Sequence, residues 1–131
     1  MSTAVLDHPL SRMSRPAASA RDAPRAFLAS AAHLRPPAKA GSLDDVLLVV
    51  AELVANAVRY TDGPSALHLE LLDDSVDVCV TDQSPRLPQL RTPGMDGTGG
   101  WGWFVIKRLA TRIHIKPMPE GGKTICAALP W

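Results

Sequence analysis

Residues 42–60 read SLDDVLLVVAELVANAVRY, and the next four residues, TDGP, break the pattern. Apolar residues recur in this stretch at spacings of three and four, which places them on one face of an α-helix. They are Leu43, Leu47, Val50, Val54 and Val58. Ser42 is a candidate N-cap, because its hydroxyl can accept a hydrogen bond from the first turn. The stretch therefore predicts a long helix with one buried face.

The residues that follow this helix alternate between apolar and polar side chains. Leu67, Leu69 and Leu71 form one such run, and residues 76–80 form a second, with two aspartates between the runs. This pattern is typical of a β-hairpin with one buried face. Residues 112–116 and 123–129 predict two further strands near the end of the chain, joined by PMPEGG.

Two more helices are predicted, from Pro24 to Leu34 and from about Trp101 to Ala110. The order helix, helix, strand, strand, long loop, helix, strand, strand predicts an α+β fold, a two-layer α/β sandwich. Its sheet would be mixed or antiparallel and covered by helices on one face. Residues 1–23 would form a flexible arm or an edge strand, and residues 24–131 the main domain.

Composition and charge narrow the classes of protein. A chain of 131 residues suits one domain. Its 14 Lys and Arg against 13 Asp and Glu give a net charge of +1, which argues against a general nucleic-acid binder. No apolar run approaches the roughly 20 residues of a membrane-spanning helix. Cys79 and Cys126 each lie in an apolar run, so we expect reduced core cysteines in a cytoplasmic protein.

Two polar residues of the long helix could carry chemistry. Glu52 and Asn56 stand four residues apart, so their side chains point the same way, one turn apart. A carboxylate beside a carboxamide suits a general base next to a hydrated Mg²⁺ ion. On spacing alone, a solvated helix face is the simpler interpretation. The apolar run around Glu52, residues 46–58, weakens that interpretation somewhat.

A second group of candidates surrounds the long loop at residues 82–100. Asp82 directly follows a predicted strand, where an aspartate commonly begins a turn. Glycines crowd the start of the helix at residue 101, where backbone N–H groups and the helix dipole can hold an anion. They are Gly97, Gly99, Gly100 and Gly102. A flexible loop end is the alternative interpretation.

Three segments occur in a fixed order: ELVANAVRY (52–60), VTDQSP (80–85) and GTGGWGWFVIKRL (97–109). A fourth, GGKTICAAL (121–129), follows near the end of the chain. This ordered set resembles the GHKL ATPase superfamily, whose ATP site is the Bergerat fold. It is most similar to the small single-domain anti-sigma-factor kinases of bacteria and their regulatory relatives.

The resemblance implies a role for each matching residue. Asn56 would coordinate the Mg²⁺ ion that bridges the ATP phosphates, and Glu52 would be the general base toward the attacking hydroxyl. Asp82 would accept a hydrogen bond from the adenine amino group. Gly100 and Gly102 match glycines that cover the phosphates, and Thr124 matches a threonine near the adenine.

The resemblance implies an ATP-binding regulator of the anti-sigma type. It would bind a sigma factor or another partner and phosphorylate a Ser or Thr of an antagonist protein; a homodimer is an expectation from relatives. Ser84 stands where the family often has glycine, and Thr98 and Gly99 stand where kinase members often carry an arginine. A non-catalytic ATP-binding interaction module, or a plain protein-interaction domain, therefore stays open as an alternative.

Overall fold

The computed structural model describes residues 3–10, 16–60, 65–84 and 101–131. The described strands form one five-stranded sheet in the order β1-β2-β3-β5-β4, and all neighbouring strands are antiparallel. Their bounds are β1 Ala4–Leu10, β2 Ser65–Leu71, β3 Ser75–Asp82, β4 Arg112–Pro117 and β5 Lys123–Pro130. The predicted α+β sandwich is confirmed, and its sheet is antiparallel.

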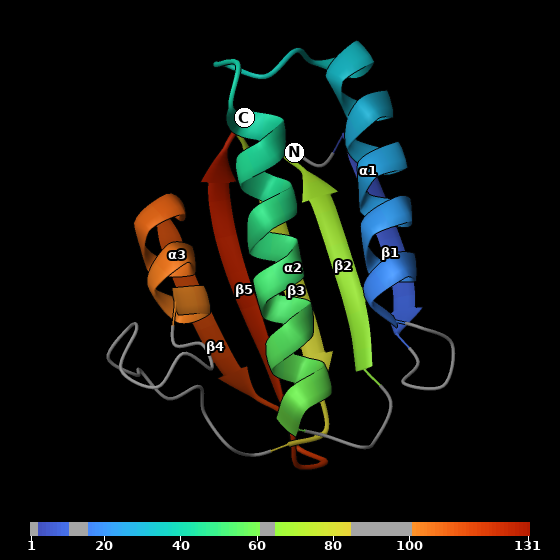
Figure 1. Cartoon of the computed structure of the whole chain (residues 1–131), viewed down its shortest axis with the longest axis vertical. Coiled ribbons are helices and arrows are strands. Elements are labelled where there is room, and N and C mark those ends of the chain that lie inside the picture. The colour runs from blue at the N-terminus through green and yellow to red at the C-terminus, as the bar shows by residue number, and fades with distance from the viewer. Residues whose placement is uncertain (1–2, 11–15, 61–64, 85–100) are drawn as a thin grey trace.

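The described part of the chain forms three helices, and they lie on one face of this sheet (Figure 1). They are α1 (Pro16–Leu34), α2 (Ser42–Tyr60) and α3 (Trp101–Leu109). Helix α2 crosses the middle of the sheet and packs against α1, α3 and β3. Of the predicted stripe, Val50 and Val54 are buried, whereas Leu43, Leu47 and Val58 are only partly buried. The most buried face of α2 is therefore turned slightly from the predicted one, and it consists of Val46, Val49, Val50, Leu53, Val54 and Ala57. None of the helices in the described part of the chain is long and apolar enough to cross a membrane.

Alternation along each strand gives the sheet two different faces. We call the face under the helices the covered face and the other the open face. In the central strands β3 and β5, the apolar residues of the covered face are almost fully buried. Most of their neighbours on the open face are half-buried, although Ala128 is 7% exposed. The buried set includes Val76, Val78, Val80, Ile125, Ala127 and Leu129.

Helix α1 begins eight residues earlier than the sequence predicts. It starts at Pro16 and contains Pro24 in its interior. Proline removes one helical hydrogen bond and therefore normally marks a helix start. Pro24 is itself buried, and Leu28 and Ala31 of the same helix are fully packed into the core. This packing outweighs the local preference, so the predicted boundary at residue 24 falls inside α1.

The start of α2 also differs in detail. The first helical hydrogen bond runs from the N–H of Asp45 to the carbonyl of Gly41, 3.0 Å away. Gly41 is therefore the N-cap, and Ser42 is the first residue of the helix. The buried Ser42 hydroxyl has no hydrogen-bond partner among the described residues. The prediction that Ser42 caps α2 is wrong, although Asp44 and Asp45 do lie in the first turn.

Candidate functional site

A buried ion pair joins the adjoining ends of the two central strands. Asp82 is the last residue of β3, Lys123 is the first of β5, and the two are paired in the register. The Lys123 ammonium lies 2.9 Å from Oδ1 and 3.0 Å from Oδ2 of Asp82, and it also donates to the Ser84 carbonyl at 3.1 Å. Both side chains face the covered side and are about 5% exposed or less. The pair is therefore held where charge is strongly shielded from water.

The chain reaches this ion pair through a tight turn. Gly122 has φ +113°, a left-handed conformation that favours glycine. A Cβ atom at this position would overlap the carbonyl oxygen of Asp82 and approach Cα of Gln83 to 3.1 Å. The glycine therefore lets β5 begin directly against the end of β3.

Glu52 lies against the first turn of α3. A Cβ atom on Gly102 would overlap the Glu52 carboxylate, and its distance to Cδ would be 3.0 Å. The positive end of the α3 dipole favours a negative charge at this place. Asn56 follows Glu52 by one turn of α2, and both side chains are half-buried. The structure thus brings Glu52 of α2 against Gly102 of α3, with Asn56 one turn further along α2.

These residues gather toward one end of the molecule. In Figure 1, β3 ends, β5 begins and α2 ends at the lower end of the molecule. Asp82 is the last residue of β3, and Asn56 lies in the last turns of α2. The predicted phosphate-binding glycines Gly97, Gly99 and Gly100 lie outside the described residues.

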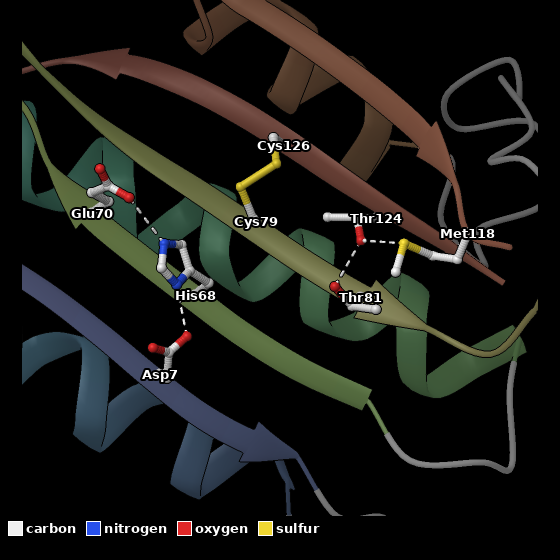
Figure 2. The surroundings of a disulfide bond; sticks show 8 residues. All are labelled: Asp7, His68, Glu70, Cys79, Thr81, Met118, Thr124 and Cys126. Atoms are coloured by element: carbon white, nitrogen blue, oxygen red, sulfur yellow. Dashed lines mark hydrogen bonds and ion pairs between the residues drawn. A yellow bond between two sulfur atoms is a disulfide. The ribbon is translucent and has the colours of Figure 1, made fainter. Parts of the chain in front are cut away.

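Thr124 does not join this group. Its hydroxyl lies 2.8 Å from the Thr81 hydroxyl and 3.5 Å from the sulfur of Met118, on the open face (Figure 2). A strand turns successive side chains to opposite faces, so Thr124 points away from the covered face to which Asp82 points. Lys123, which is not among the residues predicted from the sequence, faces Asp82 instead. The signal was available, because Lys123 shares the parity of the inward-facing Ile125 and Ala127.

The open face carries a disulfide that the sequence analysis did not expect. Cys79 and Cys126 are directly paired in the register of β3 and β5, and their Cα atoms are 4.1 Å apart. Their sulfur atoms are bonded (Figure 2). The prediction of two reduced cysteines is therefore wrong. A separation of 47 residues hides the pairing until the strand register is known.

A charged cluster lies on the same open face, across β1 and β2. The two ring nitrogens of His68 lie 2.7 Å from Oδ1 of Asp7 and 3.2 Å from Oε1 of Glu70 (Figure 2). The hydrogen bond to Asp7, followed by that to Glu70, raises the pKa of His68 against the opposing effect of burial. Burial also raises the pKa of Asp77, which stands opposite Glu70.

The chain belongs to the family of histidine kinase-like ATPase domains, which matches it over residues 14–129. The matched range covers most of the chain and includes every candidate site residue. A comparison with curated proteins gave no match. ATPase domains of this GHKL type bind ATP, typically with Mg²⁺.

The described residues fit such a ligand by their chemistry. The carboxylate of Asp82 offers an acceptor for an amino group, and the first turn of α3 offers backbone donors for an anion. Asn56 offers a carboxamide oxygen, a ligand type that Mg²⁺ accepts beside phosphate oxygens and water. Within the described ranges, no three His, Cys, Asp or Glu residues could hold a metal by themselves.

Proposed function

We propose that this protein is an ATP-dependent regulator that binds Mg-ATP between α2, α3 and the ends of β3 and β5. The placement of Glu52 against Gly102 at the start of α3 carries the proposal. It sets a carboxylate next to the helix end where phosphates would bind, with Asn56 one turn away. A plain interaction domain has no need of this arrangement.

Each residue would have a defined part in the site. Asp82 would accept a hydrogen bond from the adenine amino group, and the backbone of α3 around Gly102 would face the phosphates. Asn56 would hold Mg²⁺, while Gly97, Gly99 and Gly100 would complete the phosphate-binding loop. Thr124, expected near the adenine, points to the other face of the sheet. Lys123 lies beside Asp82 in its place and would hold the Asp82 carboxylate in position.

We further propose that the protein is a serine/threonine kinase of the anti-sigma-factor type. Bound Mg-ATP would supply the phosphoryl group. Glu52 would take the proton from a serine or threonine hydroxyl of an antagonist protein. A sigma factor would be the second partner, and a homodimer the expected assembly. We also place the protein in the cytoplasm, where ATP is available to a kinase. The Cys79–Cys126 disulfide is then an exception, because disulfides are rare in that compartment.

A comparison of two variants tests binding and catalysis separately. Glu52→Ala should abolish phosphoryl transfer and leave ATP affinity within a few-fold, because general bases contribute about 10²–10⁴-fold to the chemical step. Asn56→Ala should weaken Mg-ATP binding and transfer together. Calorimetry measures the first property, and transfer of labelled phosphate to captured partners measures the second. Asp44→Ala, an exposed carboxylate at the other end of α2, is the matched control.

The same measurements decide between the kinase and its non-catalytic alternative. ATP binding without transfer, together with a partner captured only in the presence of ATP, supports the interaction module. Full transfer by Glu52→Ala contradicts the general-base assignment. No binding of Mg-ATP at millimolar concentration contradicts the whole proposal.

A further inference from the structure

Lys123 is the one lysine among the residues that the structure describes as buried. Its side chain is 5% exposed and sits in a row of inward-facing apolar residues. An ammonium group has three donors. Two point to the oxygens of Asp82 and the third to the carbonyl of Ser84, at 2.9, 3.0 and 3.1 Å. Lys123 therefore has no donor left for a ligand.

Asp82 is held from two sides. Its Oδ1 accepts from Lys123 and from the backbone N–H of Ser84 at 2.8 Å. Its Oδ2 accepts, among the described residues, only from Lys123. Each carboxylate oxygen can accept two hydrogen bonds. With respect to the described residues, one acceptor position therefore remains on Oδ2, and its direction is fixed because both oxygens are anchored.

We propose that Lys123 is a positioning residue that holds Asp82 as a group that only accepts hydrogen bonds. The site would then select a purine with an amino group at C6 over a purine with a carbonyl at C6. This inference rests on the proposed function, in which Asp82 contacts the base. An ionised carboxylate accepts hydrogen bonds and donates none, so it pairs with the amino group of adenine and repels the carbonyl oxygen of hypoxanthine or guanine. Lys123 acts through Asp82 and touches no ligand.

The reason lies in what a buried carboxylate does without a cation. An unpaired buried charge is costly, and the group tends to take up a proton instead. A protonated carboxyl is a donor as well as an acceptor, and it can then pair with a carbonyl. Without Lys123, the one anchor of Asp82 left in the described part of the chain would be the Ser84 N–H. Both changes weaken the preference for an amino group.

The test is the ratio of the dissociation constants of ITP and ATP, measured by calorimetry with Mg²⁺. ITP carries a carbonyl where ATP carries the amino group and has the same phosphates. We expect the full chain to prefer ATP by about 10-fold or more, the effect of leaving one buried polar group unpaired. In Lys123→Met the ratio should fall to within about 3-fold of one. Lys116→Met, an exposed lysine on neighbouring β4, should keep the ratio of the parent.

A structural role alone would not change this ratio, because loss of folded protein lowers both affinities equally. Circular dichroism checks that each variant is folded. Should Lys123→Met not fold, Lys123→Gln takes its place, since its amide is a neutral donor on a shorter side chain. An unchanged ratio in the folded variant overturns this inference alone, whereas a parent protein that binds neither nucleotide overturns the proposed function with it.

Discussion

The two faces of β3 and β5 carry different kinds of contact, even between residues that are neighbours in the chain. Asp82 and Lys123 form an ion pair on the covered face, while the adjoining pair, Thr81 and Thr124, exchanges a neutral hydrogen bond on the open face. The covered face has one charged pair in an apolar layer. The open face has a disulfide, a histidine cluster and half-exposed polar residues. The alternation of the strands therefore places the Asp82–Lys123 ion pair on one face, and the disulfide and the Thr81–Thr124 hydrogen bond on the other.

The largest loss of stability is expected from breaking the Asp82–Lys123 ion pair on the covered face. Lys123→Met leaves the Asp82 carboxylate buried without its cation, and removing one partner of a buried pair costs about 3–5 kcal/mol. Urea unfolding measures the change in the free energy of unfolding. The control Lys116→Met should stay within about 0.5 kcal/mol of the parent. Equal effects of the two substitutions would contradict the difference between the faces.

Removing the disulfide of the open face should lower the free energy of unfolding of the protein by nearly as much. A link between residues 47 apart restricts the unfolded chain, which corresponds to about 4 kcal/mol in the loop-entropy model. Replacing Cys79 and Cys126 by serine should therefore lower the melting temperature by about 10 °C or more. Nucleotide affinity should stay close to that of the parent, because both cysteines lie on the face opposite Asp82. A parent melting temperature that dithiothreitol leaves unchanged would show that the bond contributes nothing.

A smaller effect is expected where α2 meets α3. Gly102→Ala introduces a methyl group at the place of the Glu52 carboxylate, which must then move. The better helix propensity of alanine offsets part of the cost. The double variant with Glu52→Ala removes the conflict, so we expect a coupling of about 0.5–3 kcal/mol between the two substitutions. Additive effects in a double-mutant cycle would place Glu52 away from Gly102.

The smallest expected effect is a pH dependence of the stability of the protein, which arises from His68 on the open face. Asp7 and Glu70 raise the pKa of His68 above its ordinary value of about 6.5. The folded protein therefore binds this proton more tightly than the unfolded chain does. The stabilisation is complete below about pH 6.5 and disappears as the pH rises through the raised pKa. The melting temperature of the parent should therefore fall between pH 6 and pH 8, in part because His68 loses its proton. His68→Gln should make this fall smaller. If the fall is as large in the variant as in the parent, other groups cause it.

Much of the fold could be predicted because its patterns are local. The stripe of α2 and the alternation of β2 and β3 each fix a buried face within a few residues. The error at α1 arises from distant parts of the chain, because packing of Leu28 and Ala31 into the core extends the helix through Pro24. The error at α2 is local and amounts to one residue, because the N-cap is Gly41 and not Ser42.

The candidate site divides in the same way. By itself, the sequence determined that Glu52 and Asn56 share one side of a helix, because a step of four residues is one turn. It also placed Asp82 at the end of a strand. Only the tertiary structure brought Glu52 against Gly102, because these residues come from different helices.

The register of β3 and β5 decided the rest. It pairs Asp82 with Lys123 and not with Thr124, and it closes Cys79 on Cys126. Each of these contacts joins residues more than 40 positions apart, so no local pattern specifies them. A shift of the register by one residue would exchange the faces of the partners, which is why the pairing of the strands had to be seen.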